Sequence, residues 1–526
     1  MAPGRRLAWG LGYAALLLLS LLALHALAQH AWIDHLKTQA AHALALAARG
    51  DTPYRWKMRS DEDIIAGRVF GAEEFRFEQG VLIVRAGEQP FEIGLALPRT
   101  VDLSLFPQLE IAAESDAPAA LAVLGRDTLV APQRELARAT FPPEAATLSL
   151  TLDAAQAATA ANDPALAPQT AMLRLNVALP AGREFRLRAA RLARRSGATL
   201  DLARPLRVLD ANAQPEAGTI SVYRLPLQSG IQAADLDAIR HVRVPQQAPL
   251  VLLPQRGRVE QQVTLRNAVF AALPGAILIP ENALDDTVAA ARAELAAPLV
   301  RDALPLRWIL LALYAAALLA ARLRPPASPA VRAALEIALA SAGPLWLVLF
   351  EPFSGHVTAR QWALIALTVS FVASLTPRPW RWNGSARAWI LALAVVGVAT
   401  VFGLLLHDGG GETHALSAGH VSRYLLWALA QQYLICAVCT ERWFALTRNT
   451  ALAAWLGALG FALLHTPNAA LMLATFIGGL CWCRLYLRER ALLPLALSHA
   501  GSALALLALL PRSLLLSAEV SARFFQ

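Results

Sequence analysis

The chain has 526 residues, 56% of them hydrophobic, and a mean hydropathy of +0.44. A composition this apolar excludes a single soluble domain, because too few polar residues remain to cover its surface. The formal net charge of +9 does not indicate nucleic-acid binding, since much of the excess is arginine in loops between apolar segments.

Residues 1–28 are predicted to be an N-terminal membrane anchor or a signal sequence. Arg5 and Arg6 precede a long apolar stretch that ends in "ALA", which is similar to a signal-peptidase site. The stretch is long for a signal peptide, which favours an uncleaved anchor, and cleavage is the open alternative. In both cases the following residues, 29–304, are expected outside the cytoplasm.

Residues 29–200 are predicted to form an exported domain rich in β-sandwich structure. Between residues 70 and 200, runs such as "VLIVRAG", "LEIAAESD" and "MLRLNVALP" alternate with a period of two, and Gly, Pro, Asp and Asn separate them. Short alternating runs of this kind indicate an antiparallel sandwich.

Residues 201–304 are predicted to be an exported mixed α/β segment. Residues 219–227 and 248–255 have strand-like patterns, and helical patterns occur near 233–241 and 283–300. Neither exported part contains a catalytic constellation. By fold-level analogy we expect the exported region to bind a glycan or a protein, with simple capping of the membrane domain as the alternative.

Residues 305–526 are predicted to be a polytopic membrane domain. Their apolar runs are separated by short polar turns, and each run can cross a hydrocarbon core of about 30 Å as a helix. Together with the first segment, we expect nine spans, at residues 7–28, 305–323, 331–350, 360–376, 388–406, 422–440, 449–466, 468–486 and 492–511.

The distribution of arginine predicts the orientation of these spans. With the N-terminus in the cytoplasm and the long exported segment left out, 13 arginines lie at cytoplasmic ends and 6 at outer ends. This bias agrees with the positive-inside rule. Heavy use of alanine and arginine, with only Lys37 and Lys57 as lysines, favours a bacterium with GC-rich codons. We therefore expect a multi-pass protein of a bacterial inner membrane, with residues 29–304 extracytoplasmic.

A few polar side chains lie inside the predicted spans. Gln431 and Gln432 lie in the middle of the sixth span, His465 ends the seventh, and His499 lies in the ninth. Polar groups inside a membrane are costly and usually functional. A single histidine can simply bond to a backbone carbonyl, but two histidines with a glutamine pair favour one shared site. The four cysteines, all near cytoplasmic ends, are interpreted as packing residues, with a metal site as the alternative.

Three segments, "QQYLICA", "FALLH" and "LSHAGSA", resemble in order and spacing the motifs of the CPBP intramembrane proteases. This family includes type II CAAX prenyl endopeptidases and bacteriocin-processing relatives. Its pattern is Glu-Glu-x-x-x-Arg, Phe-x-x-x-His and His-x-x-x-Asn. The resemblance covers about residues 390–511 and implies a CPBP-like helix bundle. The second motif is intact as Phe461 and His465, and the third keeps His499 but has Ala503 in place of Asn.

The first motif departs from the family. Gln431 and Gln432 occupy the glutamate positions, and Cys436 occupies the arginine position. In the family a glutamate is taken to activate water, while the histidines bind a metal or stabilise the oxyanion. The resemblance therefore implies a catalytic set of Gln431, Gln432, His465 and His499. It leaves the cofactor open, with a divalent metal such as zinc on His465 and His499 as the candidate.

Two functions follow from this resemblance. The first is an intramembrane endopeptidase that acts on a membrane-associated, lipidated peptide or protein. The alternative is a catalytically impaired pseudoprotease that binds or escorts a membrane partner, because a glutamine amide does not titrate and cannot act as a general base. Glu441 is a weak substitute, since it lies nine residues after Gln432 and about 180° round a regular α-helix. The bilayer itself is the other expected partner.

Overall fold

The structure is a computed structural model, and it describes residues 3–128, 130–152, 169–194, 199–225, 236, 239, 247–296, 304–351, 358–375, 380–407 and 418–510. The chain divides into two compact units. The membrane unit comprises Met1–Trp32, Gly257–Val263 and Val300–Gln526, and the β-rich unit comprises Ile33–Arg256 and Thr264–Leu299. Each unit is described by itself.

The first helix contributes to both units. Helix α1 (Pro3–Arg49) is continuous over 47 residues, and no proline interrupts it after Pro3. It ends at Gly50, whose φ of +68° is a left-handed conformation that glycine adopts easily after a helix. The helix therefore continues well past residue 28, where the sequence predicts a boundary between anchor and exported domain.

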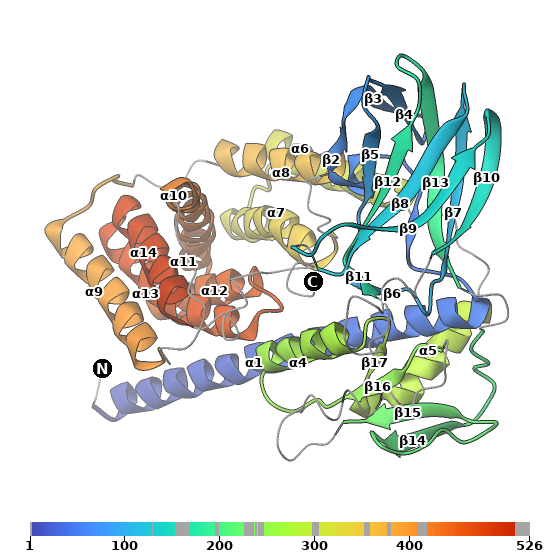
Figure 1. Ribbon diagram of the computed structural model, residues 1–526. Coiled ribbons are helices and arrows are strands. Elements are labelled where there is room, and N and C mark those ends of the chain that lie inside the picture. The colour runs from blue at the N-terminus through green and yellow to red at the C-terminus, as the bar shows by residue number, and fades with distance from the viewer. Residues whose placement is uncertain are drawn as a thin grey trace. The chain divides into compact units, whose positions relative to one another are not determined.

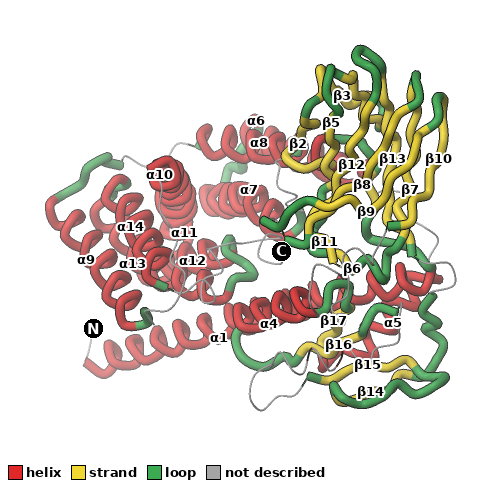
Figure 2. The backbone as a smooth tube through the Cα atoms, viewed as in Figure 1, coloured by secondary structure: helices red, strands yellow, loops and turns green. Residues whose placement is uncertain are grey.

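The β-rich unit contains the predicted antiparallel sandwich (Figures 1 and 2). One sheet has the strand order β10–β7–β13–β4–β3, with β1 also paired to β13, and the other has the order β2–β5–β12–β8–β9. The bounds are β1 Arg55–Trp56, β2 Ile64–Phe70, β3 Ala72–Glu78, β4 Val81–Ala86, β5 Phe91–Leu95, β7 Gln108–Ser115, β8 Ala119–Arg126, β9 Arg134–Phe141, β10 Glu144–Thr151, β12 Met172–Ala178 and β13 Glu184–Ala193. Two short strands, β6 (Val101–Asp102) and β11 (Gln169–Thr170), pair separately, and a 3-10 turn covers Asp61–Asp63.

Alternation along the strands explains why the two sheets face each other. In β7 the side chains of Leu109, Ile111 and Ala113 are buried, whereas Glu110 and Glu114 lie on the outer face. Because successive side chains in a strand point to opposite faces, this alternation gives each sheet one apolar face. These faces form a single apolar core in which the rings of Phe91, Phe141 and Phe185 are in contact.

The second part of the β-rich unit is a parallel four-stranded sheet in the order β14–β15–β16–β17. Its strands are β14 Leu206–Asp210, β15 Ile220–Arg224, β16 Leu250–Leu253 and β17 Ile277–Pro280, and its helices are α4 Val259–Ala272 and α5 Leu284–Ala296, with a 3-10 turn at Glu281–Ala283. The strands predicted at 219–227 and 248–255 are confirmed by β15 and β16, and α5 confirms the helix near 283–300. The helix predicted near 233–241 lies outside the described residues apart from two isolated positions.

Helices cover both faces of the parallel sheet. Residues 40–47 of α1 and part of α5 pack against one face, which includes Val222, Leu250 and Ile277. Val269 of α4 and its neighbours pack against the other face. A parallel sheet that is buried on both faces has continuous apolar strands, and "LVLL" and "ILIP" in β16 and β17 are of this kind.

The membrane unit consists of helices that follow the predicted spans closely. Their bounds are α6 Leu304–Leu323, α7 Pro329–Leu349, α8 Ala359–Ser374, α9 Ala386–Leu405, α10 Ala418–Gln432, α11 Glu441–Thr447, α12 Thr450–Leu463, α13 Ala469–Glu489 and α14 Leu493–Leu509. A π-helical segment, Tyr433–Thr440, joins α10 to α11. Among the described residues, five helices are long and apolar enough to cross a membrane, namely α1, α6, α7, α9 and α13. The helices α8, α12 and α14 are apolar but shorter.

Small residues bring three of these segments into close contact. Gly457 of α12 lies against Thr440 of the π-helical segment and Cys483 of α13, so closely that a Cβ atom at this position would lie 3.1 Å from the Cys483 Sγ. A glycine is therefore required where these segments meet. This contact fixes the position of the residues that carry the first two motifs.

Candidate functional site

His465 lies just after the end of α12, in the turn that leads to α13. Its Nδ1 atom is 2.8 Å from the carbonyl oxygen of Phe461, and the side chain is buried, with 7% exposed. A carbonyl can only accept a hydrogen bond, so Nδ1 carries the proton and Nε2 keeps a lone pair. The local i to i−4 bond thus sets the tautomer of this histidine.

His499 lies on α14, and the ring of Phe461 lies between it and His465. The Phe461 ring centroid is 4.9 Å from that of His465 and 5.3 Å from that of His499. Trp482 of α13 lies 4.9 Å from His499, and Tyr424 of α10 lies 6.2 Å from it. The histidines of the second and third motifs therefore come together around one phenylalanine, among residues of four helices.

Two successive hydrogen bonds hold Trp482 in this cluster. The Trp482 Nε1–H donates to the Ser498 hydroxyl at 3.0 Å, and that hydroxyl donates to the Ala392 carbonyl at 2.7 Å. Within the described residues the buried Nδ1 of His499 has no hydrogen-bond partner. A buried polar atom without a partner costs about 1–3 kcal/mol, so folding alone does not explain it.

The glutamines of the first motif face a different part of α13. The Oε1 atom of Gln432 accepts a hydrogen bond from the Cys436 thiol at 3.1 Å, and Cys436 lies 4.0 Å from Cys483. The buried Nε2 of Gln432 has no hydrogen-bond partner within the described part of the chain. Gln431 is half-buried. No hydrogen bond among the described residues joins either glutamine to a histidine, although Cys436 shares an apolar cluster with Phe461 and Trp482.

The π-helical segment changes the expected direction of Glu441. A π-helix has wider turns than an α-helix, so the half-turn calculated between Gln432 and Glu441 does not apply. Glu441 is buried and forms an ion pair with Arg490 at the end of α13, with Nη1 and Oε1 2.8 Å apart. Glu441 and Cys436, the hydrogen-bond partner of Gln432, thus both contact residues of α13 or its C-cap. The separation of about 180° expected for a regular α-helix does not describe this segment, because it is π-helical.

The side-chain groups around His465 and His499 that could bind a metal ion do not form a catalytic metal site. Catalytic zinc usually has three protein ligands, and among the described residues no three His, Cys, Asp or Glu side chains are grouped closely enough to hold a metal ion. His465 offers only its Nε2, and His499 is the second donor. The cysteines are free, and three of the four are buried. Cys439 and Cys483 each contact a hydroxyl group of a neighbouring segment, which agrees with a role in packing.

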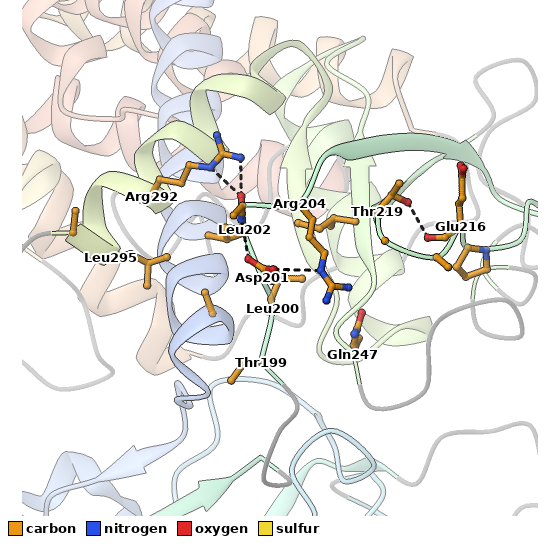
Figure 3. Close-up of a pocket in the computed structure, with 17 residues that line it drawn as sticks. Thr199, Leu200, Asp201, Leu202, Arg204, Glu216, Thr219, Gln247, Arg292 and Leu295 are labelled. Atoms are coloured by element: carbon orange, nitrogen blue, oxygen red, sulfur yellow. Dashed lines mark hydrogen bonds and ion pairs between the residues drawn. The ribbon is translucent and has the colours of Figure 1, made fainter.

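A separate hollow lies in the β-rich unit, at the ends where the strands β14, β15 and β16 begin (Figure 3). Its volume is about 1260 Å³. Asp201 and Arg204 form an exposed ion pair in it, and Arg292 donates to the Leu202 carbonyl at 2.7 Å. Ligands of open parallel sheets bind at the opposite, carboxyl ends of the strands, and the charged groups here already have partners within the chain.

A second group of buried polar residues was not found from the sequence. Glu260 and Gln262, in the first turn of α4, are 0% and 1% exposed. Both belong to the segment 257–263, which is grouped with the membrane helices. The only signal in the sequence is a Glu and two Gln after Gly257, which is too common a pattern to indicate a site.

Comparisons with known proteins agree with the motif assignment. Residues 415–505 match a family model described as type II CAAX prenyl endopeptidase Rce1-like. The chain therefore contains an Rce1-like type II CAAX prenyl endopeptidase family domain over these residues. No curated protein matches the sequence.

Solved structures similar to the chain include carbohydrate-binding modules of family 29. One such module is 12% identical over 23% of this chain and 74% of its own, with a TM-score of 0.17. A mutant of the module CBM29-2 is 12% identical over 23% of this chain and 77% of its own, with a TM-score of 0.18.

Proposed function

We propose that the Rce1-like domain binds a peptide segment of a membrane-embedded or lipidated protein beside its histidine pair, and that its activity as an endopeptidase is impaired. The observation that carries this proposal is that two motif residues, through Gln432 Nε2 and His499 Nδ1, contribute buried polar atoms without a described partner, as Tyr486 and Ser502 also do in the same helix bundle. Polar groups of this kind are rare in proteins and need an explanation. A peptide group of a bound substrate offers the acceptor and donor that they lack.

The impairment follows from the chemistry of the first motif. Gln431 and Gln432 cannot take a proton from water, because an amide does not titrate in the physiological range. Glu441 is held in its ion pair with Arg490 at 2.8 Å, and breaking a buried ion pair is costly. The zinc candidate on His465 and His499 lacks a third ligand among the described residues.

A slow endopeptidase is the second candidate, and one observation favours it. The bond from His465 Nδ1 to the Phe461 carbonyl leaves the Nε2 lone pair available. A neutral imidazole with this tautomer can act as a general base towards water. In that case His465 would take the role that a glutamate has in the family, and turnover would be low but measurable.

We further propose that the chain lies in a bacterial inner membrane with its N-terminus in the cytoplasm, and contacts along α1 support the relative direction of the helices in this topology. The Tyr13 hydroxyl donates to the Ala451 carbonyl at 3.3 Å, near the ends predicted to be cytoplasmic. Further along the helix, Trp455 Nε1–H donates to Ser20 Oγ at 2.9 Å, and Gln29 donates to the Gly257 carbonyl at 2.9 Å. Residue 257 thus meets the end of α1 that is predicted to be extracytoplasmic. The glycan or protein ligand of the exported region stays a prediction.

The test uses the purified full chain in lipid nanodiscs and a fluorescent, prenylated, membrane-anchored peptide. Binding is measured by photo-crosslinking and cleavage by mass spectrometry, for the wild type, His465→Ala and the double variant Gln431→Glu/Gln432→Glu. We expect the wild type to bind with little cleavage and His465→Ala to lose crosslinking. The double variant should cleave about a hundredfold faster than the wild type, the low end of the contribution of general-base catalysis.

The matched control is His407→Ala, which removes an exposed histidine of the same unit that also bonds to a carbonyl, that of Leu509. It should behave like the wild type. Wild-type turnover that is fast and insensitive to His465→Ala would disprove the site. Equal crosslinking of wild type and His465→Ala would disprove the binding proposal.

A further inference from the structure

The segment 257–263 is built into the membrane unit by a set of buried hydrogen bonds. The indole Nε1–H of Trp32 donates to Gln262 Oε1 at 2.7 Å, and Gln262 Nε2–H donates to Gln29 Oε1 at 3.1 Å. Gln262 also donates to the Gly257 carbonyl at 3.3 Å. Trp32 is fully buried and Gln262 nearly so. The segment is therefore held against α1 through side chains that fix its position.

Glu260, in the middle of this segment, reaches the start of α13. Its Oε1 accepts a hydrogen bond from the backbone N–H of Ala470 at 2.8 Å, although the two residues are 210 positions apart. Ala470 is the second residue of α13, and Asn468 caps the same helix by accepting from the Leu471 N–H at 3.0 Å. The first N–H groups of a helix lack partners within the helix, and its N-terminus attracts negative charge. Glu260 thus supplies an anionic cap from a distant part of the chain.

This cap lies on the turn that carries His465. The Asn468 N–H donates to the His465 carbonyl at 3.1 Å, so the backbone of the histidine and the capped end of α13 belong to one hydrogen-bonded turn. A shift of the first turn of α13 would move the backbone of His465. Such a shift would change the contact of its ring with Phe461 and the bond from Nδ1 to the Phe461 carbonyl.

We propose that Glu260 is a positioning residue for His465, and that the Rce1-like domain therefore needs a residue from outside its own boundaries to form the site. A carboxylate with 0% exposure is costly to bury unless it is bonded, and its Oε1 accepts a hydrogen bond from this helix end. The expected effect of Glu260 on peptide binding rests on the proposed function. The effect of Glu260 on the position of the His465 ring is independent of that function.

The experiment labels histidine with ¹⁵N in the full chain in nanodiscs and records solid-state NMR spectra, with His465→Ala used to assign the His465 signals. The variants are Glu260→Ala, which removes the cap, and Glu260→Gln, which keeps an acceptor oxygen but removes the charge. The matched control is Glu281→Ala, because Glu281 forms an exposed ion pair with Arg224 in the β-rich unit. Crosslinking of the prenylated peptide is measured in parallel.

We expect Glu260→Ala to shift or broaden the Nδ1 signal of His465 and to weaken peptide crosslinking about tenfold, which corresponds to about 1.4 kcal/mol. Glu260→Gln should restore most of the wild-type signal, and Glu281→Ala should change neither readout. Unchanged His465 signals in both Glu260 variants would overturn the proposal. If Glu260→Ala does not fold, Glu260→Asp decides, because its side chain is one methylene shorter and keeps the charge away from the Ala470 N–H: a shifted His465 signal supports the proposal, and an unshifted signal rejects it. Absence of crosslinking in the wild type would count against the proposed function alone, since the NMR signals are recorded without peptide.

Discussion

The sandwich and the membrane helices differ in where they place their polar side chains. In the sandwich the core cluster is apolar and aromatic, and charged side chains pair on the outer faces, as Arg191 does with Glu110 at 2.7 Å. In the membrane unit the imidazole of His499 and the amide of Gln432 are buried, each with an atom that lacks a described partner. The sandwich core also contains a buried atom without a described hydrogen-bond partner, the Tyr54 hydroxyl, but it lies in a core of otherwise apolar side chains. In the membrane unit two such atoms belong to motif residues, and polar groups inside membrane helices are usually functional.

The largest expected effect is a loss of stability of the sandwich when an aromatic ring is removed from its core. Phe185→Ala removes the ring that contacts both Phe91 and Phe141 in the core. Loss of a fully buried phenylalanine costs about 3–5 kcal/mol, so the free energy of unfolding of the β-rich unit should fall by this amount. Denaturant unfolding, followed by circular dichroism in the β region, measures it.

The control for this variant is Arg188→Ala, which removes an exposed ion pair with Glu114. Surface pairs contribute about 0–1 kcal/mol. A loss for Phe185→Ala no larger than that for Arg188→Ala would show that the apolar core does not dominate the stability of the sandwich.

A smaller effect is expected where the membrane helices pack. In Gly457→Ala the new Cβ would collide with the Thr440 hydroxyl and lie 3.1 Å from the Cys483 Sγ. Overpacking of this kind costs about 1–3 kcal/mol, and it would displace the π-helical segment that follows Gln432. The matched control is Gly460→Ala on the same helix, where nothing lies within 4 Å of the added atom. The measurement is thermal unfolding in nanodiscs, and equal melting temperatures for the two variants would contradict the expected packing.

The two regions also differ in how much of each follows from sequence. Alternation in β7 reports directly on burial, and apolar runs such as α9 report on the length needed to cross a membrane, so the sandwich and the ends of most membrane helices were predictable. Helix α4 was not predicted, because its apolar and polar residues are mixed around the helix. The π-helical segment was not predictable either, since its Thr440 packs against Gly457 and Cys483 on other helices. The motif histidines were found by their pattern, whereas the contact of Glu260 with Ala470 joins distant segments that no local pattern connects.

The smallest expected effect concerns the charges on the outer face of the sandwich. The Arg186 guanidinium, followed by Arg76, lowers the pKa of the Glu184 carboxyl below its usual 4.5. Because the folded-state pKa is the lower one, the ionised carboxylate stabilises the folded state above pH 4.5. That contribution is lost as the pH falls from 4.5 through the folded-state pKa. Glu184→Gln should therefore flatten the dependence of sandwich stability on pH in this acidic window and leave the slope near pH 7 unchanged.

Denaturant midpoints measured between pH 3 and pH 7 (approximate limits of the usual carboxyl titration) provide the test. Glu88→Gln, at an exposed position on the loop after β4, serves as the control and should keep the wild-type slope. A Glu184→Gln variant that keeps the wild-type slope below pH 4.5 would show that its ion pairs with Arg186 and Arg76 are screened by solvent. In that case the charges around Glu184 would contribute nothing measurable to the stability of the sandwich, in contrast to the buried ring of Phe185 in its core.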